Sequence, residues 1–108
     1  MADQIDIQDA KLGSYQQYVQ KAMKERGFND ETVSQKFMLL LEEAGQFAQT
    51  ARREANLKAR SDRMPSDSLA DEAADVLTVL LDICNQLGID LETAFVQKEH
   101  KNQTRSWE

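Results

Sequence analysis

Apolar residues recur every three to four positions along most of this chain, which is the spacing of one buried face of an α-helix. The pattern predicts a polar tail or frayed helix start over residues 1–12, and then a first helix that Ser14 caps and Gly27 ends. A second helix is predicted to begin at Asn29 or Asp30 and to carry an apolar stripe toward the middle of the chain.

Two further helices are predicted after a basic, polar connection. The third begins at Ser66 or Asp67 and stops at Gly88, and Asp90 caps a fourth that ends near Arg105. Apolar residues make up 41% of the chain, and one proline and four glycines interrupt it, which favours a few long helices over many strands. The predicted fold is therefore all-α, a four-helix bundle.

The length of the chain, 108 residues and 12.3 kDa, leaves room for one small domain, which the pattern places at residues 13–108. A domain of this size buries a limited core, so association into an oligomer is expected. The longest apolar run, Val76 to Ile83, contains Thr78 and Asp82. No segment is therefore predicted to span a membrane.

The net charge is −6 and the pI is about 4.8, which disfavours binding to the anionic backbone of a nucleic acid polymer. Small phosphates are less affected, because a bound divalent cation inverts the local charge. The start of the chain, Met1 to Asp9, lacks the basic and apolar segments of a signal peptide. The lone Cys84 has apolar helical neighbours, so we expect a buried thiol in a cytoplasmic protein.

Two acidic clusters lie inside apolar-patterned helical stretches rather than in polar loops. They are Glu42-Glu43-Ala44-Gly45-Gln46 and Glu72-Ala73-Ala74-Asp75. Residues three apart share one face of a helix, so Glu43 and Gln46 point the same way from one helix. Glu72 and Asp75 do so from another. Facing each other, these side chains would form the cage of hard oxygen ligands that Mg²⁺ prefers, with Mn²⁺ as an alternative.

The positions of two of these acids argue against ordinary solvent-exposed carboxylates. Glu43 shares its helix face with Leu40 and Phe47, and Glu72 follows Leu69 on a buried stripe. Burying an ionised carboxylate without a partner costs several kcal/mol, so acids placed there require a cation. From the pattern alone, that cation is either a metal or a basic side chain in an ion-paired helix face.

The predicted fourth helix carries a second unusual face. Phe95, Lys98 and Asn102 follow each other at the spacing i, i+3 and i+7, so an apolar stripe becomes polar. Lys98 either extends to solvent or offers its charge to a phosphate, with Asn102 as a hydrogen-bonding partner. His100 lies off this face, and the chain has no second histidine to complete a zinc site.

In the order of these motifs the chain resembles the MazG-type nucleoside triphosphate pyrophosphohydrolases of the all-α NTP pyrophosphatase superfamily. That family carries Glu-Glu-x-x-Glu on one helix and Glu-x-x-Asp on the next. The matching segments here are Leu41-Glu42-Glu43-Ala44-Gly45-Gln46-Phe47, Ala70-Asp71-Glu72-Ala73-Ala74-Asp75-Val76-Leu77 and the turn Leu87-Gly88-Ile89-Asp90-Leu91-Glu92. The resemblance covers roughly residues 15–105.

The resemblance implies an enzyme that hydrolyses a nucleoside or deoxynucleoside triphosphate to the monophosphate and pyrophosphate, a nucleotide-clearing activity. It implies that Mg²⁺ is held by four side chains, Glu43, Gln46, Glu72 and Asp75. Glu42 would orient or activate a water together with Glu43, and Lys98 and Asn102 would contact the phosphates. It also implies a homodimer or a dimer of dimers.

Gln46 departs from the family pattern, because a neutral amide stands where the family has a carboxylate. The loss of one charge is expected to weaken metal binding while hardly changing the shape of the site. Gln46 is either an introduced change that traps substrate or a natural variation in metal use. Two other readings stay open: a dUTPase-like or phosphoribosyl-ATP pyrophosphohydrolase of the same superfamily, and a non-catalytic helical dimerisation module.

Overall fold

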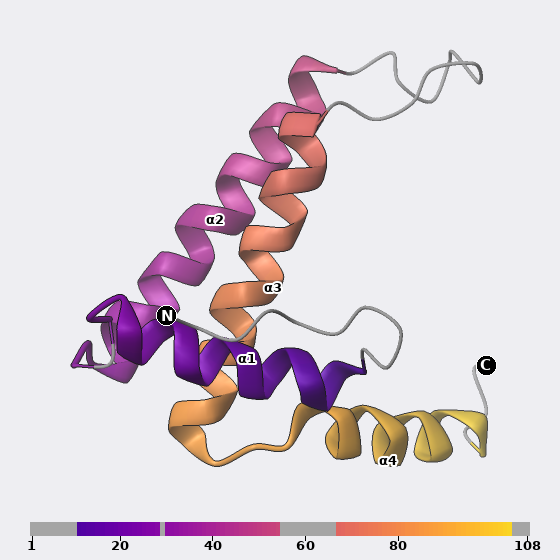
Figure 1. The fold of residues 1–108 in the computed structure, drawn as a ribbon. Helices are drawn as coiled ribbons and strands as arrows, with labels where there is room; N and C mark the ends of the chain where they lie inside the picture. Colours follow the sequence, from indigo (N-terminus) through magenta and orange to yellow (C-terminus); the bar gives the residue numbers. More distant parts are fainter. Residues whose placement is uncertain (1–10, 29, 55–66, 105–108) are drawn as a thin grey trace. The chain divides into compact units, whose positions relative to one another are not determined.

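The computed structural model of the chain describes residues 11–28, 30–54 and 67–104. These residues form four helices, α1 (Leu12–Glu25), α2 (Val33–Arg53), α3 (Asp67–Leu87) and α4 (Leu91–Gln103), and they contain no strand (Figure 1). The prediction of an all-α, four-helix chain is confirmed. None of these helices is long and apolar enough to cross a membrane.

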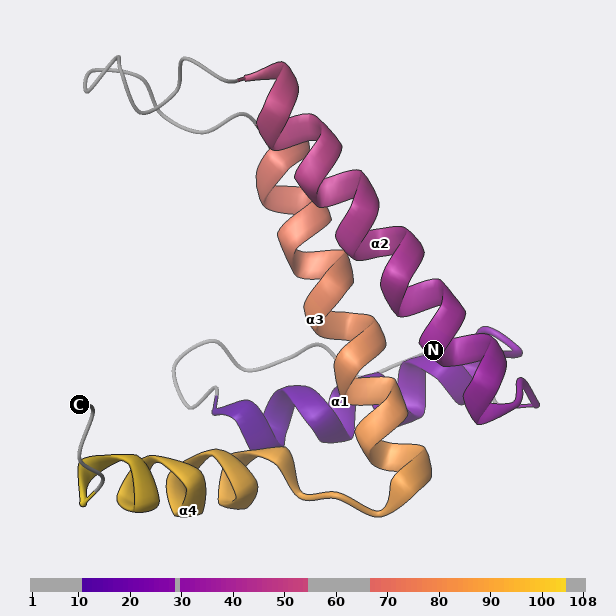
Figure 2. The same cartoon turned by 180° about the vertical axis from the view of Figure 1, so that it is seen from behind.

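The chain divides into two compact units, and α3 contributes to both. We call residues 31–80 the acid-bearing unit, and residues 1–30 together with 81–108 the terminal unit. In the acid-bearing unit, α2 and the part of α3 up to Leu80 lie side by side and run in opposite directions, as both views show (Figures 1 and 2). All the acids predicted for the metal site therefore belong to this one helix pair.

The start of each of the first two helices differs from the prediction. α1 begins at Leu12 with Lys11 as its N-cap, and no side chain caps it, so the prediction that Ser14 is the cap was wrong. α2 is capped by Thr32 and not by Asp30; Asn29 lies outside the described residues.

Reciprocal hydrogen bonds explain the choice of Thr32. The backbone N–H of Gln35 donates to Thr32 Oγ1 at 3.1 Å, and the backbone N–H of Thr32 donates to Gln35 Oε1 at 2.8 Å. This capping box satisfies two backbone donors at once, which a lone aspartate does not.

The helix ends follow the predicted signals closely. Gly27 and Gly88 adopt positive φ angles of 80° and 71°, a conformation that favours glycine. The residues after them return hydrogen bonds to the last turn of α1 and α3, from the N–H of Phe28 to Met23 O (2.8 Å) and from that of Ile89 to Cys84 O (2.9 Å). As predicted, Asp90 caps α4, and its carboxylate accepts from the N–H of Thr93 at 3.2 Å.

A buried amide connects α1 to the turn between α3 and α4 in the terminal unit. Gln16 is 9% exposed; its Nε2 donates to Ile89 O at 2.6 Å, and its Oε1 accepts from the N–H of Leu91 at 3.1 Å. Asn85 Nδ2 donates to the backbone oxygen of Gln16 at 3.0 Å. Both polar atoms of the Gln16 side chain are thus satisfied by a backbone more than 70 residues away in sequence.

The apolar stripe predicted for α2 is only partly covered within one chain. Leu40 and Phe47 are half-buried, whereas Leu41 is 67% exposed and its neighbour Met38 is 59% exposed. An apolar strip on α2 therefore faces away from the packing contacts of the single chain.

Candidate functional site

A side-chain hydrogen bond joins α2 to α3 in the acid-bearing unit. Thr50 Oγ1 donates a hydrogen bond to Glu72 Oε1 at 2.8 Å. Glu72 was placed on the buried stripe of its helix by the sequence pattern, between Leu69 and Val76, and it is half-buried in the structure. The prediction that this carboxylate is withdrawn from solvent is confirmed.

The second oxygen of the same carboxylate has no partner. Glu72 Oε2 is buried and makes no hydrogen bond to any other described residue. Among the described side chains, one other atom shares this condition, Asn102 Oδ1 in the terminal unit. Leaving a buried polar group unsatisfied costs about 1–3 kcal/mol, and more for a charged group. Both atoms belong to residues that the sequence had pointed to as site residues.

The hydrogen bond between Thr50 and Glu72 also sets the levels at which the other site residues lie. Because the two helices are antiparallel, residues before Thr50 on α2 face residues after Glu72 on α3. Gln46 precedes Thr50 by four residues and Asp75 follows Glu72 by three, so these two lie within about 2 Å of the same height along the pair. Glu43 lies about 10 Å along the axis from the contact between Thr50 and Glu72.

The predicted site residues therefore lie at different heights along the helix pair, and the structure does not gather their acidic side chains at one point. Within residues 11–28, 30–54 and 67–104, no group of three or more acidic, histidine or cysteine side chains lies close enough to hold a metal ion. Glu43 is half-buried and Asp75 is exposed. Gln46, the position without an acid, is also exposed and lies at a similar height to Asp75 along the helix pair.

Three further residues were predicted for the site. Glu42 is exposed on α2. On α4, Lys98 is exposed and Asn102 is half-buried, and both belong to the terminal unit. The donor chemistry fits a hard divalent cation, and Glu72 Oε2 is the atom that most needs one, because it is buried and unpaired.

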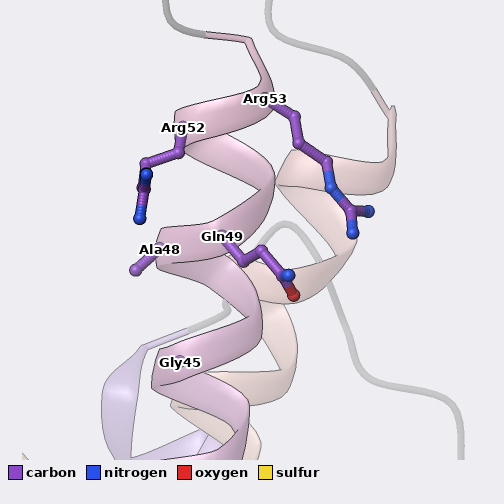
Figure 3. Close-up of a pocket in the computed structure, with 5 residues that line it drawn as sticks. All are labelled: Gly45, Ala48, Gln49, Arg52 and Arg53. Atoms are coloured by element: carbon purple, nitrogen blue, oxygen red, sulfur yellow. The ribbon is translucent and has the colours of Figure 1, made fainter.

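A hollow of about 620 Å³ lies along α2 next to the acidic segment. Its lining residues are Gly45, Ala48, Gln49, Arg52 and Arg53. Figure 3 shows Gln49 and Arg53 extending to one side of the helix, and Arg52 extending to the other. Gln49 and Arg53 come three and seven residues after Gln46, so they continue its side of α2. A guanidinium there has the planar donors that suit a phosphate group.

Comparison with known protein families shows to which family the chain belongs. Residues 31–107 match the MazG nucleotide pyrophosphohydrolase domain. The chain belongs to the MazG family. No curated protein and no solved structure matches it.

The matched region contains α2, α3 and α4, and therefore every predicted site residue from Glu42 to Asn102 of this MazG domain. The resemblance inferred from the two acidic motifs is confirmed at the level of the family. The match begins at residue 31, which is also where the acid-bearing unit begins.

Thr50 is the residue of this site that sequence reasoning missed. Its position carried a usable signal, since it follows Gln46 by four residues and Glu43 by seven and so shares their helix face. Its partner could not be read from that spacing, because Glu72 lies on another helix.

Proposed function

We propose that this MazG domain hydrolyses nucleoside or deoxynucleoside triphosphates to the monophosphate and pyrophosphate in a reaction that requires a divalent metal. The observation that carries the proposal is the buried, unsatisfied carboxylate oxygen Glu72 Oε2 of the acid-bearing unit; in the terminal unit, Asn102 Oδ1 is also unsatisfied. A carboxylate oxygen suits a metal ion, and an amide oxygen suits a hydrogen-bond donor of a ligand or of a positioning group. The family membership supports the nucleotide substrate.

The residues that would hold the metal are Glu43, Gln46, Glu72 and Asp75. All four come from the helix pair of the acid-bearing unit and offer hard oxygen atoms, which favours Mg²⁺ with Mn²⁺ as an alternative. When bound, such a cation neutralises phosphate charge and makes an attacking water more acidic.

The other predicted site residues have complementary roles in the proposal. Glu42 is exposed and can accept a hydrogen bond from the attacking water. Lys98 supplies a positive point charge to the phosphates, and Asn102 orients them through its amide. Arg53 offers a further cationic contact from the hollow beside Gln46.

We also propose that the active form is a homodimer or homotetramer. Met38 and Leu41 on α2 expose apolar surface in the single chain. Burial of such surface stabilises an assembly by roughly 25 cal/mol per Å² of apolar area.

The test is pyrophosphate release from a panel of standard and modified deoxynucleoside triphosphates with Mg²⁺, measured on this chain and on Gln46→Glu. The added carboxylate restores the acid that the family pattern has at this position, as a ligand for the proposed cation. A unit charge pair about 4 Å apart is worth roughly 1–4 kcal/mol at the dielectric of a protein surface. We therefore expect Gln46→Glu to bind Mg²⁺ roughly tenfold more tightly or better.

Gln20→Glu is the matched control, because it makes the same chemical change at an exposed position of α1 in the terminal unit. It should leave metal affinity and turnover close to those of the unmodified chain. Nucleotide binding and slow turnover by this chain, with faster turnover by Gln46→Glu, support the proposal. The absence of nucleotide binding, metal binding and turnover in both proteins would contradict it and favour a helical dimerisation module. A strict preference for dUTP or phosphoribosyl-ATP would assign the chain to one of those branches.

A further inference from the structure

The hydroxyl of Thr50 is used in an unusual way for a residue inside a helix. Threonine in a helix commonly donates its proton to the backbone oxygen one turn earlier. Thr78 does this on α3, donating to Ala74 O at 2.9 Å. Thr50 instead donates across the helix pair to Glu72 Oε1 at 2.8 Å.

This cross-helix bond distinguishes the two oxygens of one carboxylate. An ionised carboxylate only accepts hydrogen bonds, so the proton in this contact comes from Thr50. Oε1 is therefore occupied, while Oε2 is buried and has no hydrogen-bonding partner in the described part of the chain. The terminal torsion of a glutamate is broad and roughly two-fold, so an unanchored carboxylate turns freely between its two oxygens.

We propose that Thr50 is a positioning residue for the metal site, which holds Glu72 Oε1 so that Oε2 alone is offered to a divalent cation. The inference rests on the function proposed above. Magnesium demands near-octahedral coordination, so the orientation of each ligand oxygen matters. Partners that orient a metal ligand typically change metal affinity by about 10–100-fold when they are removed.

The location of Thr50 on α2 agrees with this role. It follows Gln46 by one turn and Glu43 by two turns, so it extends the face that carries the proposed ligands of α2. A residue at the end of this face can reach Glu72 without occupying the space of a ligand.

The experiment measures Mg²⁺ affinity by calorimetry, and Mn²⁺ affinity by electron paramagnetic resonance, on the full chain without nucleotide. The variants are Thr50→Val, which removes the hydroxyl and keeps the shape, and Thr50→Ser, which keeps the hydroxyl. Thr78→Val is the matched control, because it removes a hydroxyl that bonds only within its own helix. Each variant is also made in the Gln46→Glu background, where the metal is expected to bind more tightly.

We expect Thr50→Val to weaken metal binding by about 10–100-fold, with Thr50→Ser and Thr78→Val close to the parent protein. Thermal melting without metal checks that each variant is folded. Glu72→Gln separates the two levels of the proposal. If Glu72→Gln abolishes metal binding while Thr50→Val binds as tightly as Thr78→Val, the positioning role is overturned and the site stands. If neither parent background binds metal, the proposed function and this inference both fail.

Discussion

Gln16 in the terminal unit and Glu72 in the acid-bearing unit are both polar side chains withdrawn from solvent, but their hydrogen bonding differs. Both polar atoms of Gln16 have backbone partners, at 2.6 and 3.1 Å. Glu72 has one satisfied oxygen and one buried oxygen without a partner among the described residues. The hydrogen-bonding capacity of the Gln16 amide is thus met within the single chain, whereas one oxygen of Glu72 still requires a partner.

The difference agrees with a structural role for Gln16 and with the proposed metal-binding role of Glu72. Buried polar groups in folded proteins are almost always hydrogen-bonded, so a satisfied amide such as that of Gln16 needs no further explanation. An unsatisfied charged oxygen requires one, such as a ligand or ion. Asn102 is the exception within the terminal unit, and it is also a proposed substrate contact.

The largest effect is expected on catalysis, from a change at Glu72. Glu72→Gln removes the charge but keeps the shape, and we expect it to lower pyrophosphate release by about a thousandfold, because a bound cation supplies several kcal/mol to the reaction. The free energy of unfolding should not fall, since an unpaired buried charge is itself destabilising. Steady-state kinetics and thermal melting in chelator give the two readouts.

Asp71→Asn is the matched control for this change, because it neutralises an exposed neighbour on the same helix. It should retain activity. The opposite result would be a Glu72→Gln protein whose melting temperature is well below that of the parent and whose metal affinity is unchanged. It would show that Glu72 has a structural role like that of Gln16, and it would contradict the contrast drawn between the two residues.

A smaller effect, on stability alone, is expected in the terminal unit. Gln16→Leu removes the partners of Ile89 O and of the N–H of Leu91, which should lower the free energy of unfolding by about 1–3 kcal/mol. Chemical denaturation measures this change, and Gln17→Leu, at an exposed neighbouring position, is the control. Metal affinity should be the same in both variants. A loss of metal binding in Gln16→Leu with normal stability would contradict the division between the two units.

The smallest expected effect concerns the buried thiol of the terminal unit. Burial raises the pKa of Cys84 above its ordinary value of 9.0. Above that pH, the unfolded chain loses the thiol proton while the folded chain keeps it, so the unfolded state binds fewer protons and stability falls as pH rises. The free energy of unfolding, measured by chemical denaturation from pH 8 upward, should fall less steeply with pH for Cys84→Ala than for the parent. Equal slopes would show that the thiol does not contribute.

Local sequence determined the elements of this protein and the burial of its key acid. The positive φ angles of Gly27 and Gly88 and the cap at Asp90 follow from residue types whose conformational preferences act over one turn. Glu72 lies between Leu69 and Val76 on its helix, so periodicity alone predicted that it would be withdrawn from water. Thr32 was missed, although its capping box with Gln35 is also a local signal.

The tertiary structure alone decided which polar atoms meet. Periodicity shows which face of a helix is buried, but it carries no information on how far one helix is shifted along another. The bond between Thr50 and Glu72 sets that shift for α2 and α3, and it places Gln46 level with Asp75 while Glu43 lies farther along. The partners of Gln16 are likewise brought to it from distant residues by packing. The spacing of apolar residues along a helix predicts which face is turned toward the core, whereas hydrogen bonds between elements depend on packing between residues far apart in the chain.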